Sequence, residues 1–411
     1  MLALSGQIPR SAHTYDLQAG SLTLHVQAVD GGDPSGSALF AIAERINPKR
    51  AFLFVSTVLG RHIPVDPVTH RAVLRRLAQG VSQHLLAGPV FVMGFAETAV
   101  GIGAGVFDCL ADAHPGRAMG YLSTTRFAPL GAAPWFTIRE SHSHAVDHII
   151  MVPRNGVLQH GADATLVMVD DETTTGATFA ELAAGLQAQE LTFGRVVLVT
   201  LTDWSDGRAA VAVAGVFGKA DVREGSLQKG RFDWAPRPGW VPAALPDACA
   251  PGCAVWHPRA DQAFAPPRMG LVASEGRKSG QDILTGLEVT GLDVPCSTDR
   301  VLVIGAGEHV WQPMLVAEAL AARGVFTRFI TTTRSPILQG GAIAQKRSFP
   351  DHYGHGFWMY LHNVVPGDWD RILLFTETGI DGVPTDLLGW LGRVDVIDGA
   401  GVVSAYAGVM L

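Results

Sequence analysis

The chain of 411 residues has a hydrophobic share of 47%, a charged share of 17% and a net charge of −7 at pH 7. These values exclude wholesale disorder and argue against nucleic acid as a partner, since no basic run stands out. The length predicts two or three domains, and no apolar run approaches the ~20 residues that a membrane helix needs.

The cysteines and the N-terminus indicate a reducing compartment. The four cysteines are sparse and irregularly spaced, and MLALSGQIPRSAHTYD lacks the features of a secretory signal. We therefore expect a cytoplasmic protein. Cys249 and Cys253 form a close pair with only His257 as a further candidate ligand, so small buried or loop cysteines are favoured over a zinc site.

Apolar runs and helical spacings alternate along the first part of the chain. The pattern predicts strands at 51–60, 89–95, 118–126, 165–171 and 194–204, and helices at 68–86, 98–113 and 179–189. Continuous apolar strands that alternate with helices indicate a mainly parallel sheet covered on both faces. We assign residues 1–205 to this α/β domain.

Order weakens over residues 206–265, where clusters of Pro, Gly and Trp predict an irregular linker. Residues 266–411 then show a second α/β pattern of Rossmann-like type. It consists of a strand, a Gly turn and a helix at 300–324, strands at 325–336 and 369–379, and a helix at 384–392. Because Val310 stands where the dinucleotide fingerprint needs its third glycine, NAD is disfavoured.

The stretch TLVMVDDETTTGAT, residues 165–178, places two acids at the carboxyl end of a predicted buried strand, where open α/β sheets bind ligands. The next helix begins near Thr178, so its first N–H groups, the threonine hydroxyls and Gly176 form an anion cradle. The carboxylates of Asp170 and Asp171 suit sugar hydroxyls, either directly or through Mg²⁺. We predict a ligand such as a ribose 5-phosphate, with an ordinary capped turn as the alternative.

The same stretch resembles the phosphoribosyl-pyrophosphate signature of type I phosphoribosyltransferases, and the match runs from Val167 to Thr178 without a gap. The resemblance implies an α/β fold of that type and a magnesium-dependent transferase. It implies that Asp170 and Asp171 hold the ribose hydroxyls. It assigns the 5-phosphate to Thr174, Thr175, Gly176, Ala177 and Thr178.

Such a transferase needs a second anion site for pyrophosphate, and MGFAETAVGIGAG (93–105) is the best candidate. The stretch follows a predicted strand and opens a Gly/Ala-rich helix. A carboxylate beside pyrophosphate is unfavourable unless Mg²⁺ intervenes, and the alternative is a helix whose glycines only permit close packing. The candidate residues are Gly94, Phe95, Ala96, Glu97 and Thr98.

The segment TIRESHSHAVDHI (137–149) is the candidate catalytic loop. In a loop over pyrophosphate, arginine offers bidentate donors and histidine transfers protons. A metal set that includes His148 and a polar hairpin with solvated histidines are the alternatives. Arg126, in STTR, either joins the same rim or belongs to a plain loop. The catalytic candidates are Arg139, Glu140, His142 and His144.

Two further stretches narrow the resemblance. ERINPKRAFLFVSTVLGRHIPVDP (44–67) and ESHSHAVDHIIMVP (140–153) are similar to the phosphoribosyltransferase of tellurite-resistance gene clusters, often labelled orotate-phosphoribosyltransferase-like. TTTRSPI (331–337) resembles the motif of the TRSP domain that follows that enzyme. The resemblance covers roughly residues 35–205 and 265–390, and it implies a base-like acceptor, a nucleoside-like product and a homodimer.

Polar residues that follow strands of the second domain suit a rim for an anionic or nucleotide ligand. These candidates are Gly305, Gly307, Glu308, Thr333, Arg334 and Ser335. We expect a phosphoribosyltransferase that uses phosphoribosyl pyrophosphate, Mg²⁺ and a small nucleobase-like acceptor. The alternative is a regulatory protein that binds the same ligand without catalysis.

Overall fold

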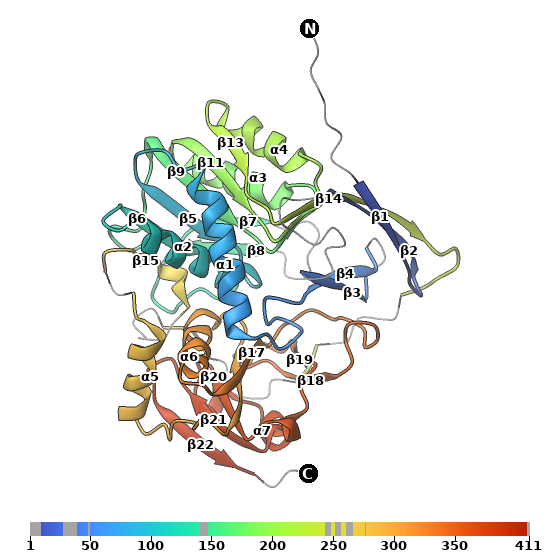
Figure 1. The fold of residues 1–411 in the computed structure, drawn as a ribbon, viewed down its shortest axis with the longest axis vertical. Coiled ribbons are helices and arrows are strands. Elements are labelled where there is room, and N and C mark those ends of the chain that lie inside the picture. The colour runs from blue at the N-terminus through green and yellow to red at the C-terminus, as the bar shows by residue number, and fades with distance from the viewer. Residues whose placement is uncertain are drawn as a thin grey trace.

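A computed structural model describes residues 10–27, 39–47, 50–139, 147–242, 248–250, 256–259, 266–275 and 277–408. Figure 1 shows the first half of the chain, blue to green, lying above the second half, yellow to red. Both halves are α/β, as the sequence predicts. Within the described residues, no helix is long and apolar enough to cross a membrane.

The first half is built on a six-stranded sheet whose strands are parallel except at one edge. Its order is β13 (Asp221–Glu224), β11 (Phe193–Val199), β9 (Gly161–Val169), β5 (Val90–Gly94), β6 (Met119–Ser123) and the antiparallel β15 (Leu271–Val272). The central strand β5 is buried along its whole length, which explains its unbroken apolar sequence. The predicted mainly parallel sheet is therefore confirmed.

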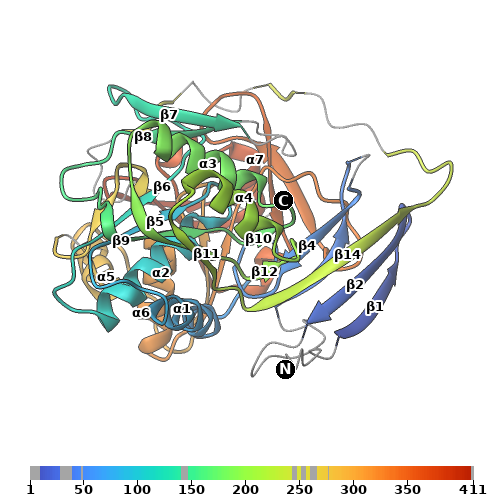
Figure 2. The same cartoon turned by 90° about the horizontal axis from the view of Figure 1, so that it is seen from above.

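Helices cover both faces of this sheet. Figure 2 shows α1 (Pro67–Ser82) and α2 (Ala99–Ala113) on one side of it, and α3 (Ala177–Ala188) and α4 (Arg208–Phe217) on the other. The hairpin β7 (Pro134–Arg139) and β8 (Asp147–Met151) lies beside α3. The strand–helix alternation thus places the carboxyl ends of β5, β6 and β9 on one edge, where the helices of the next units begin.

The structure differs from the expectation of an irregular segment over residues 206–265. Arg208–Phe217 is helix α4, and β13 extends the central sheet. Gln228–Pro236 is the long strand β14, which pairs with β2 (Gly20–Gln27). The neighbouring Gly and Pro clusters obscured a run of small apolar helix residues and an alternating strand, so residues 208–236 belong to the first half.

A second sheet and a hairpin flank the central sheet on one side. The sheet has the order β1 (Arg10–Asp16), β2, β14, β12 (Thr202–Asp203) and β10 (Glu172–Thr173), and the hairpin joins β3 (Phe40–Glu44) to β4 (Phe52–Ser56). Rings from both elements form one cluster, in which Phe54 stacks on Trp204 at a centroid distance of 4.7 Å. The cluster holds the hairpin beside the carboxyl ends of the central strands.

The second half contains a five-stranded sheet with the order β17 (Phe326–Thr331), β16 (Arg300–Gly305), β20 (Arg371–Phe375), β21 (Arg393–Ile397) and β22 (Val403–Ala407). All of its pairings are parallel except that of β22. The remaining elements are the helices α5 (Gly280–Val289), α6 (Trp311–Ala322) and α7 (Thr385–Leu391), the hairpin β18 (Lys346–Pro350) with β19 (Trp358–His362), and the 3₁₀ turns Pro267–Met269, Pro366–Asp368 and Ile380–Gly382.

The two halves share one hydrophobic core, in which α6 packs against α1 and α2. Arg71 of α1 donates to both carboxylate oxygens of Glu318 in α6, with its Nε 2.6 Å from Oε1. Backbone bonds also cross the boundary, since Val65 and Phe329 donate to each other's carbonyl oxygen at 2.9 Å. The second half is therefore packed firmly against the first half.

Candidate active site

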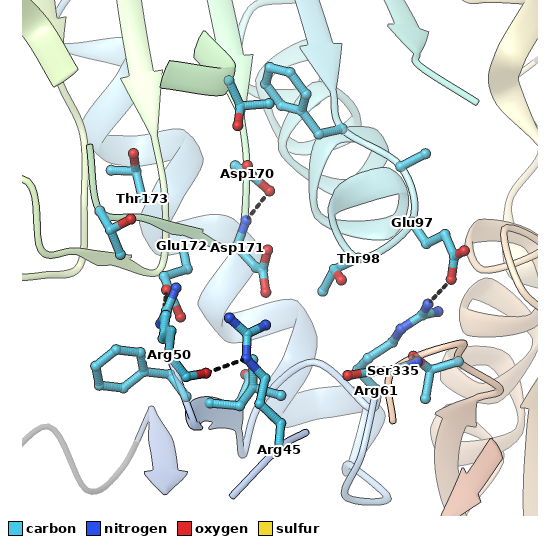
Figure 3. Close-up of a pocket in the computed structure, with 18 of the residues that line it drawn as sticks. Arg45, Arg50, Arg61, Glu97, Thr98, Asp170, Asp171, Glu172, Thr173 and Ser335 are labelled. Carbon is cyan, nitrogen blue, oxygen red and sulfur yellow. Dashed lines mark hydrogen bonds and ion pairs between the residues drawn. The ribbon is translucent and has the colours of Figure 1, made fainter. Parts of the chain in front are cut away.

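A cavity of about 880 Å³ opens at the carboxyl ends of β5 and β9, with the hairpin β3–β4 opposite (Figure 3). Its lining combines loops of the first half with residues 333–336 of the second half. These segments are far apart in the sequence. The packing of the two halves brings them to one place.

The loop between β9 and α3 forms one wall of this cavity. Asp170, Asp171 and all of Thr174–Thr178 line it. Gly176 has a φ of +78°, and a Cβ there would lie 2.3 Å from the Cα of Ala209, so only glycine fits this turn. Helix α3 starts at Ala177, and the first N–H groups of a helix have no partner within it. The loop therefore presents backbone donors and hydroxyls suited to a phosphate.

The two acids at the start of this loop lie side by side. The backbone N–H of Asp171 donates to Oδ1 of Asp170 at 2.9 Å. Burial and the neighbouring carboxylate of Glu172 raise the pKa of Asp171 to about 6. A carboxylate held in this way is stabilised by hydroxyl donors or by a cation, both of which favour its charged form.

The loop between β5 and α2 forms a second wall. Phe95, Ala96, Glu97 and Thr98 line the cavity, whereas Gly94 does not. A Cβ on Gly94 would lie 2.7 Å from the hydroxyl of Tyr121 and 2.8 Å from the carbonyl of Ala99. Gly94 therefore serves the close packing of α2 on the sheet, and the pyrophosphate role of the four lining residues stays a prediction.

Glu97 sits between two arginines from different halves of the chain. Its carboxylate accepts hydrogen bonds from Arg61 and from Arg334. Burial alone would raise the pKa of Glu97, but the guanidinium groups of Arg334 and Arg61 lower it to about 2. Two arginines therefore compensate the charge of this carboxylate, and the wall keeps an excess of positive charge.

Arg126 joins this wall from the end of β6. Its Nη1 donates to the carbonyl of Asp147 at 2.6 Å, and its Nη2 lies 3.0 Å from Nε2 of His148. The other ring nitrogen of His148 lies 2.9 Å from the hydroxyl of Thr124. Because both nitrogens of His148 have protein partners, this histidine is not available to a metal, and Arg126 is held facing the cavity.

Of the four catalytic candidates, the structure describes Arg139. Arg139 ends β7, lines the cavity rim and is 84% exposed, with its Nε 3.7 Å from a carboxylate oxygen of Asp147. Glu140, His142 and His144 lie outside the described residues. The structure thus brings Arg139 to the rim of the cavity, and the catalytic roles of all four residues stay predictions.

The six second-domain candidates fall into two groups. Thr333, Arg334 and Ser335 line the cavity, and Gly305, Gly307 and Glu308 do not. Glu308 instead accepts a hydrogen bond from the backbone N–H of Arg126 at 2.6 Å, and the carbonyl of Gly307 accepts one from Arg61 at 3.2 Å. Glu308 and Gly307 therefore join the two halves.

Sequence reasoning missed the wall opposite the acids. Arg45, Arg50 and Arg61 line the cavity together with four aromatic residues, Phe52, Phe54, Phe232 and Trp234. Arg50 pairs with Glu172 (Figure 3). The Cζ atom of Arg50 lies 5.0 Å from the ring centroid of Phe52. A signal was present, since residues two apart in a strand share a face and the aromatics are spaced in that way.

The donor set near Asp170 and Asp171 suits a hard cation. Mg²⁺ binds through one or two carboxylates together with phosphate oxygens of a substrate, rather than in a protein cage. In the described part of the chain, no group of three or more His, Cys, Asp or Glu side chains is placed to hold a metal ion.

Each half of the chain matches the model of a known protein family. Residues 39–231 match the family model of phosphoribosyl transferases, and residues 268–388 match that of the TRSP domain found C-terminal to them. No curated protein matches the chain.

Solved structures with a similar fold include several phosphoribosyltransferases. The adenine phosphoribosyltransferase of Trypanosoma brucei is 11% identical, with 46% of this chain and 76% of that chain covered and a TM-score of 0.33. The orotate phosphoribosyltransferase of Aeropyrum pernix is 18% identical, with 47% and 89% covered and a TM-score of 0.29. The two matches identify a phosphoribosyl transferase domain followed by a C-terminal TRSP domain in this chain.

Proposed function

We propose that this enzyme transfers the 5-phosphoribosyl group of phosphoribosyl pyrophosphate to a ring nitrogen of a small nucleobase-like acceptor. The observation that carries the proposal is a single cavity lined by an acid pair with a phosphate-binding turn, by an arginine-rich loop and by aromatic rings. Each of these three surfaces matches one part of the two substrates.

The ribose 5-phosphate fits the loop after β9. The carboxylates of Asp170 and Asp171 accept hydrogen bonds from the ribose hydroxyls, and Thr174–Thr178 surround the 5-phosphate with N–H and hydroxyl donors. The left-handed turn at Gly176 supports this assignment, because a side chain there would collide with α4.

The aromatic wall fits the acceptor. Phe232 and Trp234 are half-buried in β14 and line the cavity opposite the acids. Planar bases stack on such rings with a gain of ~1–3 kcal/mol per base. Arg45 and Asn47 line the same side and provide polar groups for the edge of a base.

In the reaction, the bond between C1 of the ribose and the diphosphate oxygen breaks, and its electron pair leaves with the diphosphate. The lone pair of the acceptor nitrogen forms the new bond to C1, and the nitrogen then loses its proton to a general base. His142 and His144 remain the candidates for that base. Positioning and fixed charges supply most of the rate.

Asp170 and Asp171 are the residues that would hold Mg²⁺, with oxygens of the substrate. The ion supplies charge neutralisation for the diphosphate as it leaves.

The test is incubation of the protein with phosphoribosyl pyrophosphate, Mg²⁺ and a panel of bases, followed by phosphorus NMR. We expect release of pyrophosphate with one class of base and loss of the signal in Asp171→Asn. Asp163→Asn, an exposed acid at the start of β9 and outside the cavity, is the matched control. Tight binding without turnover for every base would instead favour the regulatory protein.

A homodimer remains a proposal from the family resemblance. Sedimentation equilibrium at micromolar protein tests it, and a strictly monomeric active enzyme would contradict it.

A further inference from the structure

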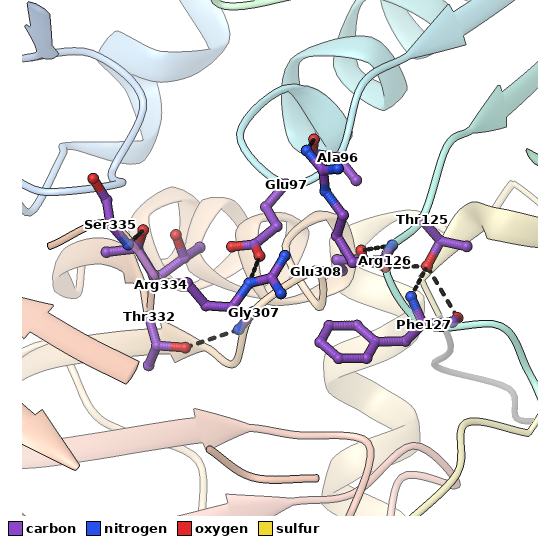
Figure 4. Close-up of polar contacts among 12 residues, drawn as sticks. Ala96, Glu97, Thr125, Arg126, Phe127, Gly307, Glu308, Thr332, Arg334 and Ser335 are labelled. Carbon is purple, nitrogen blue, oxygen red and sulfur yellow. Dashed lines mark hydrogen bonds and ion pairs between the residues drawn. The ribbon is translucent and has the colours of Figure 1, made fainter. Parts of the chain in front are cut away.

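The segment 331–336 of the second half reaches into the cavity as a fixed arm. The N–H of Thr331 donates to the carbonyl of Gly60 at 2.7 Å, and the N–H of Thr333 donates to the carbonyl of Tyr360 at 3.0 Å. Both halves therefore hold the backbone just before Arg334, and Figure 4 shows this arginine pointing toward Glu97. Arg334 follows directly and is positioned by backbone that cannot easily move.

The guanidinium of Arg334 also lies close to two aromatic rings. Its Cζ lies 5.5 Å from the ring centroid of Phe127 and 5.1 Å from that of Phe357. The side chain is 22% exposed and lines the cavity. Its Nη2 atom has no hydrogen-bond partner among the described residues. Arg334 thus has donor capacity beyond the bond that it makes with Glu97.

Arg61 approaches the same carboxylate from the first half. Its Nη2 bonds to Glu97, and its Nη1 donates to the carbonyl of Gly307 and to the hydroxyl of Thr331 at 3.2 and 3.1 Å. The second half therefore fixes this arginine too. The carboxylate of Glu97 occupies the space between two guanidinium groups, which is the space that two oxygens of a diphosphate would need.

We propose that Arg334 is a diphosphate-binding residue, and that the leaving group takes over both arginines from Glu97. The second half then completes the transferase site and is not an independent module. The inference rests on the proposed function, because it identifies the diphosphate subsite of that reaction. It differs from a packing role, in which Arg334 would only neutralise Glu97.

A double-mutant cycle separates these two roles. Pyrophosphate and ribose 5-phosphate are titrated calorimetrically, each with Mg²⁺, into the full-length wild type, Arg334→Ala, Glu97→Gln and the double variant. We expect Arg334→Ala to lose ~10- to 100-fold in pyrophosphate affinity, since charged hydrogen bonds are lost, and to keep its ribose 5-phosphate affinity. Glu97→Gln should bind pyrophosphate more tightly, because it removes the competing charge.

The deciding comparison is made in the Glu97→Gln background. If Arg334 binds diphosphate, removing it there still costs at least tenfold; if it only neutralises Glu97, the double variant binds like Glu97→Gln and the inference fails. Arg393→Ala, an exposed arginine of the second half outside the cavity, should leave both affinities unchanged. A wild-type protein that binds neither ligand would refute the proposed function itself. An Arg334→Ala variant with unchanged pyrophosphate affinity would refute only the role of Arg334.

Discussion

At the scale of single residues, the site contains a carboxylate whose ionisation is opposed by burial and by a neighbouring charge. Asp171 is partly buried beside Glu172, and its pKa is raised because burial and this neighbour oppose ionisation. A carboxyl whose pKa is higher in the folded protein than in the unfolded chain stabilises the fold at low pH. That contribution is lost as the pH rises from the ordinary value of 3.8 through about 6.

Asp171→Asn should therefore change stability and binding in opposite directions. At about pH 8 the free energy of unfolding should rise by about 1–3 kcal/mol, since a buried charge is removed, and the gain should vanish towards about pH 4. Ribose 5-phosphate affinity should fall by about tenfold, because an acceptor for a hydroxyl is lost. Urea unfolding across pH, with calorimetry for the ligand, measures both; a variant that loses stability at about pH 8 would contradict the assigned burial.

At the scale of elements, the sequence predicts the parts of the site that come from one strand and the turn after it. The loop after β9 could be predicted from its own residues, because an apolar run, two acids and a Thr/Gly turn follow one another directly in the sequence. The aromatic wall was not predicted from the sequence, because Phe54 and Trp234 belong to strands that are far apart in the chain and lie in different sheets. The ion-pair partners of Glu97 were not predicted for the same reason, since Arg61 and Arg334 come together only when the two halves pack.

The aromatic wall makes a separable prediction for the acceptor. Trp234→Ala should raise the KM for the base by about tenfold, because a stacking surface is lost, with the affinity for phosphoribosyl pyrophosphate unchanged. Trp240→Ala, which lies outside the cavity shortly after the same strand, is the control. Steady-state kinetics with each substrate varied in turn would measure the two KM values separately. An equal rise in the KM of both substrates would argue against this location for the base.

At the scale of the whole molecule, the two halves share their core and their buried charges. Arg268 donates to both oxygens of Glu377 at 2.8 Å and to Glu308 at 3.3 Å. Burial raises the pKa of Glu308, and Arg268 opposes that effect. Because Glu308 also accepts from the backbone of Arg126, this cluster connects the second half to a wall of the cavity.

Arg268→Met should lower the free energy of unfolding of the whole chain by about 3–5 kcal/mol at neutral pH, since two carboxylates lose a buried partner. The loss should be smaller at about pH 5, where protonation removes part of the uncompensated charge. Scanning calorimetry at both pH values measures it, and a single shifted transition is expected for a shared core. Two transitions, of which only one moves, would contradict the view of the halves as one unit.

A crystal structure with phosphoribosyl pyrophosphate and Mg²⁺ tests the central claim most directly. The account predicts the ribose hydroxyls at Asp170 and Asp171, the 5-phosphate within Thr174–Thr178, and the diphosphate between Arg61 and Arg334. A ligand bound elsewhere, or one whose diphosphate leaves the bond between Arg334 and Glu97 intact, would contradict it.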